Sequence, residues 1–131
     1  MDGKTVGQIG AGLVILLGVT HDDSEKDVDT LVNKITNLRV FESDKGHFET
    51  SLLEENKEVL VVSQFTLYGS TKKGRRPDFA EAAKSDHAEK LYNYFVDKMR
   101  ETGLKTETGV FGAMMDVSLV NSGPVTFMLE S

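Results

Sequence analysis

Polar side chains that can do chemistry gather near the end of an otherwise apolar stretch of the sequence. Ser63, Gln64 and Thr66 supply two hydroxyls and an amide directly after Val59–Val62. A buried polar group without a partner costs on the order of 1–3 kcal/mol, and α/β folds often bind ligands where their strands end. Segment 63–66 is therefore either part of a ligand site or the wet face of an edge strand. No Gly-x-Ser-x-Gly motif is present, which disfavours a serine hydrolase.

A glycine-rich basic loop follows this segment. Four positive charges fall close together, at Lys72, Lys73, Arg75 and Arg76. Gly69 and Gly74 have the spacing of a phosphate-binding P-loop, but arginines replace the lysine and hydroxyl residue that must come next. That replacement excludes an NTPase. The loop is either a solvated surface loop or one that contacts phosphate.

A third polar segment, Asn121–Thr126, lies between two apolar runs near the end of the chain. The plainest interpretation of Gly123-Pro124 within it is a turn, since only about 5–6% of X–Pro bonds in folded proteins are cis. Metal chemistry is not indicated. The chain has no cysteine, and none of its three histidines has a second histidine at ligand spacing.

Hydrophobic periodicity predicts the elements that position these residues. In the first half we expect a strand at 4–9, a strand at 12–19 buried on both faces, a helix at 24–38, and a hairpin of 39–42 with 47–51. In the second half we expect a strand at 58–67, a helical turn opened by Pro77, a helix from a capping box at Asp86 to Gly103, and strands at 104–110, 114–120 and 125–129. This order predicts a β-rich, mixed α/β fold.

Length and charge bound the function classes. The chain has 131 residues and a net charge of −6, which fits one domain and argues against a protein that coats nucleic acid. We find no signal peptide and no apolar run near the ~20 residues that cross a bilayer. We therefore expect a soluble cytoplasmic protein without a membrane partner.

Three separated motifs resemble the D-aminoacyl-tRNA deacylase family in the same order along the chain. They are Val62–Leu67, Gly74–Phe79 and Val117–Phe127, and the runs Gly10–Gly18 and Tyr92–Phe95 match as well. The likeness covers essentially the whole chain, as one deacylase-like domain over 1–131. It implies layered sheets forming a barrel-like core with two main helices.

The resemblance further implies a homodimer that hydrolyses the ester of D-aminoacyl-tRNA, and of glycine mischarged on tRNA, without a cofactor or metal and without DNA as a partner. The catalytic segment would be Ser63, Gln64, Phe65 and Thr66. The substrate would also meet Gly112, Ala113, Asn121, Gly123 and Pro124, with the Gly-Pro pair, cis in the family, reaching into the partner's site. Clash with an L side chain would then reject L substrates and leave glycine accepted.

Two mechanisms are open within that resemblance. Either the hydroxyl of Thr66 attacks or positions water, or the 2′-hydroxyl of the terminal adenosine assists while main-chain N–H groups form an oxyanion hole. We favour the second, because no histidine has an evident route to Thr66 and an unactivated hydroxyl is a poor nucleophile. The charges of the basic loop would contact the tRNA acceptor end weakly.

Two alternatives come from other classes: a non-catalytic module that binds the acceptor end, and a small-ester hydrolase that uses Thr66. The chain opens at what corresponds to the family's second strand. The arginine of the first strand, which in the family helps to hold the Gly-Pro loop, has no counterpart in this sequence. This departure is the main support for the binding module.

Overall fold

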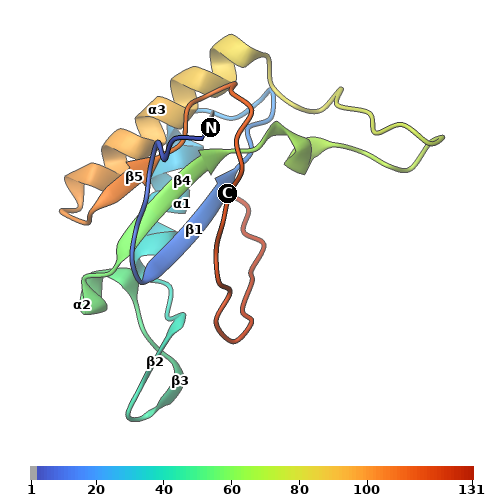
Figure 1. Ribbon diagram of the computed structural model, residues 1–131. Helices are drawn as coiled ribbons and strands as arrows, with labels where there is room; N and C mark the ends of the chain where they lie inside the picture. The colour runs from blue at the N-terminus through green and yellow to red at the C-terminus, as the bar shows by residue number, and fades with distance from the viewer. Residues whose placement is uncertain (1–2) are drawn as a thin grey trace.

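In the computed structural model, which describes residues 3–131, a three-stranded parallel sheet is covered on one face by two long helices (Figure 1). The sheet has the order β1 (Gly12–Leu17), β4 (Glu58–Ser63) and β5 (Thr106–Thr108). β1 and β4 pair from Gly12 opposite Glu58 to Leu17 opposite Ser63. Parallel pairing places the carboxyl ends of all three strands at one edge of the sheet.

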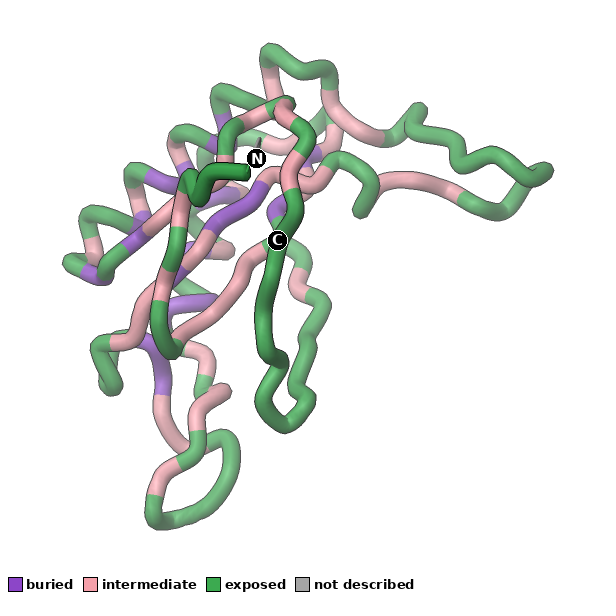
Figure 2. The backbone as a smooth tube through the Cα atoms, viewed as in Figure 1, coloured by how far each residue is buried: buried purple, intermediate pink, exposed green. Residues whose placement is uncertain are grey.

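The core lies between this sheet and the helices α1 (Glu25–Asn37) and α3 (Ser85–Glu101), where the buried backbone gathers in Figure 2. Each helix buries a stripe at helical spacing: Val28, Val32 and Ile35 on α1, and Leu91, Tyr92, Phe95, Val96 and Met99 on α3. These side chains meet Val59 and Val61 of β4, which are fully buried. Among the described residues no helix is both long and apolar enough to cross a membrane.

Two helix ends agree with the sequence and one does not. Ser24 caps α1 and forms a capping box with Asp27, and Gly103 follows α3 with a φ of 85°, in the left-handed region that glycine adopts most easily. The predicted capping box at Asp86 is wrong. α3 begins at Ser85 after Lys84, so Asp86 lies inside the first turn, where its charge still favours the helix dipole.

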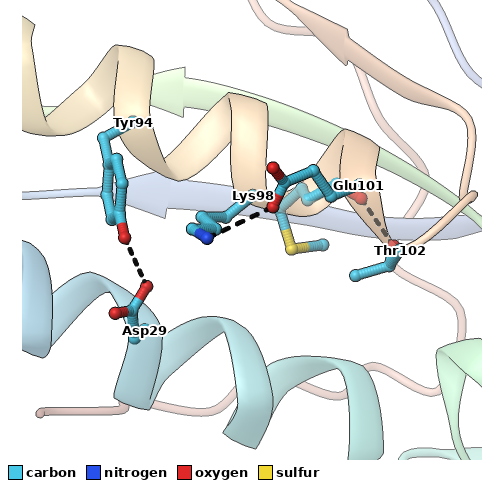
Figure 3. A network of polar contacts seen from close by, with 6 residues as sticks. Asp29, Tyr94, Lys98, Glu101 and Thr102 are labelled. Atoms are coloured by element: carbon cyan, nitrogen blue, oxygen red, sulfur yellow. Dashed lines mark hydrogen bonds and ion pairs between the residues drawn. The ribbon is translucent and has the colours of Figure 1, made fainter.

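Figure 3 shows a polar contact between the two long helices and a second polar contact along α3. The hydroxyl of Tyr94 donates a hydrogen bond of 2.8 Å to Asp29, and Lys98 lies 3.3 Å from Glu101 one turn along α3. The bond to Asp29 holds the proton on the phenol and raises the pKa of Tyr94. The contact with Glu101 raises the pKa of Lys98.

The predicted hairpin is confirmed as β2 (Phe41–Ser43) and β3 (Gly46–Thr50). A short helix that the sequence reading missed, α2 (Leu52–Glu55), follows it. Ser51 caps α2: its side chain accepts from the backbone of Glu54, whose carboxylate accepts from the backbone of Ser51. That pattern is a capping box, and it was visible in the sequence.

Two predictions in the first half are wrong. Residues 4–9 form no strand, although Gly7 lies so close to the carbonyl of Thr108 that a Cβ would overlap it. The strand predicted at 12–19 ends at Leu17 and is not buried on both faces, because β1 is an edge strand of a sheet whose second face lacks a helix layer. Leu16 on that face is 46% exposed.

Beyond β5 the chain departs further from the prediction. The strand expected at 104–110 is confirmed as three residues, but none forms at 114–120 or 125–129. A strand needs a neighbour to accept its backbone hydrogen bonds, and these segments instead form an exposed excursion (Figure 2). The mixed α/β class is confirmed. In the described residues the strands form an open parallel sheet and a separate hairpin, whereas a barrel-like core was expected.

Candidate active site

The catalytic candidates lie at the carboxyl edge of the parallel sheet. β4 ends at Ser63 rather than at the predicted residue 67, and the chain turns into the 3₁₀ helix η1 (Phe65–Tyr68). The backbone N–H of Gln64 donates to the carbonyl of Leu17 at 2.9 Å, which joins the ends of β4 and β1. The polar segment thus leaves the core at the edge where open α/β sheets bind ligands.

A hydrogen bond within the segment joins two of its candidate side chains. The amide Nε2 of Gln64 lies 2.5 Å from the hydroxyl oxygen of Thr66. Ser63 and Gln64 are half-buried, whereas Phe65 and Thr66 are exposed. In the described part of the chain this amide is the one hydrogen-bond partner of the Thr66 hydroxyl, so no base stands beside it.

The first turn of η1 presents free backbone donors. In a 3₁₀ helix the bonds run from residue i+3 to residue i, and here Leu67 donates to Gln64 and Gly69 to Thr66. The N–H groups of Phe65 and Thr66 precede these bonds and have no acceptor within residues 3–131. Two neighbouring N–H groups on an exposed turn can bind an oxyanion.

The turn after β5 reaches the same edge. The N–H of Gly109 donates to the carbonyl of Val61 at 3.4 Å, and the N–H of Ala113 donates to Val110 at 3.2 Å. Gly112 has a φ of 75° at this turn. Gly112 and Ala113 therefore follow β5, which pairs with Val59–Val61 of β4.

The basic residues lie on a loop that projects from the molecule (Figure 1). Ser70 and Asp78 close its base through two backbone hydrogen bonds of 2.7 and 2.8 Å. Pro77 does not open a helical turn as predicted, because its neighbour Asp78 pairs with Ser70 instead. The four charged side chains between them are exposed, at Lys72, Lys73, Arg75 and Arg76.

The loop at 121–126 is held by one side chain. Asn121 accepts a hydrogen bond from the N–H of Val125 at 2.8 Å and donates to the hydroxyl of Thr126 at 2.9 Å. The Gly123–Pro124 peptide bond is cis. The C-terminal segment that carries this loop runs away from segment 65–68 in Figure 1.

Sequence reasoning gave no role to three residues beside the site. Phe79 packs its ring edge-on against that of Phe65, with centroids 5.0 Å apart. The hydroxyl of Thr20 and the ring nitrogen Nε2 of His21 contact the carbonyls of Glu81 and Ala80. Phe79 lies inside the motif Gly74–Phe79, which could have indicated a role for it. No comparable signal in the sequence indicated a role for Thr20 or His21.

Comparison with known proteins gives one family. The model of the family described as D-Tyr-tRNA(Tyr) deacylase matches residues 1–130. D-aminoacyl-tRNA deacylases of Bacillus cereus (strain G9842) and Aquifex aeolicus (strain VF5) are 55% and 56% identical over all 131 residues, which span 90% and 88% of those proteins.

Solved structures give the same result. A structure titled c-Myc DNA Unwinding Element Binding Protein superimposes with a TM-score of 0.87 at 44% identity, over 94% of this chain and 84% of the other. A probable eukaryotic D-amino acid tRNA deacylase shares the fold, with a TM-score of 0.61 at 20% identity over 72% of this chain and 55% of that one. With motifs, fold and full-length relatives in agreement, this chain belongs to the D-Tyr-tRNA(Tyr) deacylase family.

Proposed function

We propose that this chain, acting as one domain in a homodimer, hydrolyses the ester bond that joins a D-amino acid, or mischarged glycine, to the terminal adenosine of tRNA. The observation that carries the proposal is the exposed start of η1. There the N–H groups of Phe65 and Thr66 lack an acceptor within the described residues and stand beside the Gln64–Thr66 hydrogen bond. The products are the free D-amino acid and tRNA with a free hydroxyl.

In the proposed reaction a water molecule adds to the ester carbonyl carbon. The carbonyl oxygen becomes an oxyanion, and the N–H groups of Phe65 and Thr66 stabilise its charge. The carbon–oxygen bond to the ribose then breaks, and the ribose oxygen leaves with a proton from the attacking water. The neighbouring 2′-hydroxyl of the adenosine positions that water, because within residues 3–131 the hydrogen-bond partner of the Thr66 hydroxyl is an amide and not a base.

The dimer is supported by apolar side chains that one chain leaves in water. Met114, Val120 and Met128 are 93%, 92% and 78% exposed, and all three lie on the C-terminal excursion. Large apolar side chains left exposed on one segment are typical of an interaction site. A two-fold interface repeats each contact, so each subunit would lend its Gly123–Pro124 loop to the other's η1.

In that arrangement the Gly123 and Pro124 backbone would receive the substrate's amino group, and a side chain of L configuration would clash with the loop. Rejection by clash discriminates without any added attraction for the D form. Glycine has no side chain to clash, so glycine mischarged on tRNA is accepted. Gly112 and Ala113, on the turn after β5, would line the same pocket.

The test is deacylation of D-Tyr-tRNA and L-Tyr-tRNA measured side by side with this chain. Loss of the D ester alone supports the proposal. A free D-tyrosine ester, which lacks the 2′-hydroxyl, is the matched control substrate. Equal rates on the free ester would favour a small-ester hydrolase that uses Thr66, and binding of both tRNAs without hydrolysis would favour an acceptor-end binding module.

A further inference from the structure

The ring of Phe79 occupies a junction between the basic loop and η1. The two ring centroids of Phe79 and Phe65 lie 5.0 Å apart at an interplanar angle of 62°, an edge-to-face arrangement that aromatic pairs prefer. Its other contact is with Gly69, where a Cβ would stand 2.8 Å from the Phe79 ring. Phe79 therefore touches the first residue of η1, Phe65, and the residue that follows η1, Gly69.

Backbone pairs hold Phe79 from both sides along the chain. On one side Asp78 pairs with Ser70 at the base of the basic loop. On the other side Ala80 contacts the ring of His21 at 2.6 Å, and Ala83 donates to the carbonyl of Val19 at 2.9 Å. Residues 80–83 thus fix Phe79 to the chain that follows β1 through contacts that do not involve η1.

The turn that receives these bonds is itself stiff. The carboxylate of Asp23 accepts from the backbone N–H of Thr20 at 2.8 Å, and the carbonyl of Asp23 contacts the ring of His87 on α3 at 2.8 Å. The hydroxyl of Thr20 donates to the carbonyl of Glu81. Because this turn directly follows β1, it ties residues 80–83 to the edge of the sheet from which η1 emerges.

We infer that Phe79 is a positioning residue, which sets the orientation of the η1 backbone through its ring contacts with Phe65 and Gly69. The inference rests on the proposed function, since it assigns the N–H groups of Phe65 and Thr66 to the reaction. Phe65 is 57% exposed and η1 buries no residue, so the ring contact with Phe79 adds to the backbone bond from Gln64 to Leu17 in holding this end of η1. A small rotation of η1 would turn both N–H groups away from a developing oxyanion.

The test compares Phe79→Leu with Phe79→Tyr, which keeps the ring and extends its para position; Phe79 is 37% exposed. Phe79→Leu is expected to lower kcat for D-Tyr-tRNA about ten- to a hundredfold, as a misplacement near 1 Å does, with KM within about twofold. In Phe79→Tyr, kcat should stay near the wild-type value. Phe41→Leu is the matched control, because Phe41 packs against the core at the far hairpin.

A second readout does not depend on activity. Leu67 and Gly69 donate the backbone bonds that define η1, so their amide hydrogen exchange should accelerate in Phe79→Leu and stay unchanged in Phe41→Leu. If the wild type is inactive but amide exchange at Leu67 and Gly69 is still faster in Phe79→Leu, the proposed function is refuted and the positioning of η1 by Phe79 is not. If the wild type is active and Phe79→Leu changes neither kcat nor amide exchange, the role assigned to Phe79 is overturned. The same holds if Phe41→Leu changes both as much as Phe79→Leu does.

Discussion

The side-chain amide of Gln64 and the hydroxyl of Thr66 stand 2.5 Å apart at the start of η1, with the amide nitrogen as donor. An amide donor occupies a lone pair on the hydroxyl oxygen and takes no proton from it. The hydroxyl is therefore oriented but not activated. This relationship separates a positioning role for Thr66 from a nucleophilic one.

Thr66→Ala should retain part of the deacylase activity. We expect kcat on D-Tyr-tRNA to fall about tenfold, which corresponds to roughly 1.4 kcal/mol, because the N–H donors of Phe65 and Thr66 survive the substitution. Thr66→Ser keeps the hydroxyl and serves as the control. Complete loss in Thr66→Ala, with full recovery in Thr66→Ser and unchanged melting temperatures, would instead identify Thr66 as the nucleophile.

Asn121→Ala should weaken selection against L substrates. Asn121 makes both side-chain hydrogen bonds within the loop, to Val125 and Thr126, and rejection by clash requires an ordered loop. The ratio of D-Tyr-tRNA to L-Tyr-tRNA hydrolysis is expected to drop about tenfold. Asn93→Ala, at an exposed position of α3, is the control. An unchanged ratio would show that Asn121 does not order the loop during catalysis.

Neutralising the basic loop should reduce the salt dependence of the reaction. With the four residues changed to Gln, the slope of log(kcat/KM) against log[salt] should lose about 0.7–0.9 for each phosphate contact removed. The substitutions should raise KM and leave kcat unchanged, because the loop does not touch the reacting atoms.

The matched control removes four charges elsewhere. It changes to Gln the exposed lysines Lys26, Lys34, Lys45 and Lys90. Net charge then shifts equally in the two proteins, so a difference in slope reports contact at the loop. Equal slopes would mean that the loop is merely solvated.

Asp27 should contribute stability that acid removes. The backbone N–H of Ser24 donates to its carboxylate, and this bond lowers the pKa of Asp27 below the ordinary 3.8. A lowered pKa in the folded state stabilises the protein above the unfolded value, and that stabilisation disappears as pH falls through the folded pKa.

The melting temperature of Asp27→Asn should accordingly lie below that of wild type near neutral pH, and the two should converge below pH 3.8. Asp22→Asn, in the exposed turn ahead of the helix, provides the comparison. If the difference in melting temperature between wild type and Asp27→Asn grew as pH fell, the pKa of Asp27 would not be lowered by folding.

Tyr92→Phe should destabilise the fold more than Tyr94→Phe does. The hydroxyl of Tyr92 is buried and donates to the carbonyl of Val61 at 3.0 Å. Losing such a bond costs about 0.5–1.5 kcal/mol, or a few degrees in melting temperature. The bond from Tyr94 to Asp29 is exposed to water, which replaces it at little cost. Thermal unfolding in which Tyr94→Phe loses as much or more would overturn this ranking.

The sequence by itself determined the elements whose patterns are local. The stripes of α1 and α3 and the apolar runs of β1 and β4 each carry their signal within a few residues. The motif at 62–67 likewise marked the candidate site, because polar residues at the end of an apolar strand are unusual.

Only the tertiary structure decided where strands end and what lies beside the site. β4 stops at Ser63 because the chain bonds back to Leu17 and turns into η1. The segments at 114–120 and 125–129 have strand-like patterns but form no strand, since backbone pairing needs a neighbour that a pattern cannot supply. The contact of Phe79 with Phe65 joins residues from two different segments, and only folding brings them together.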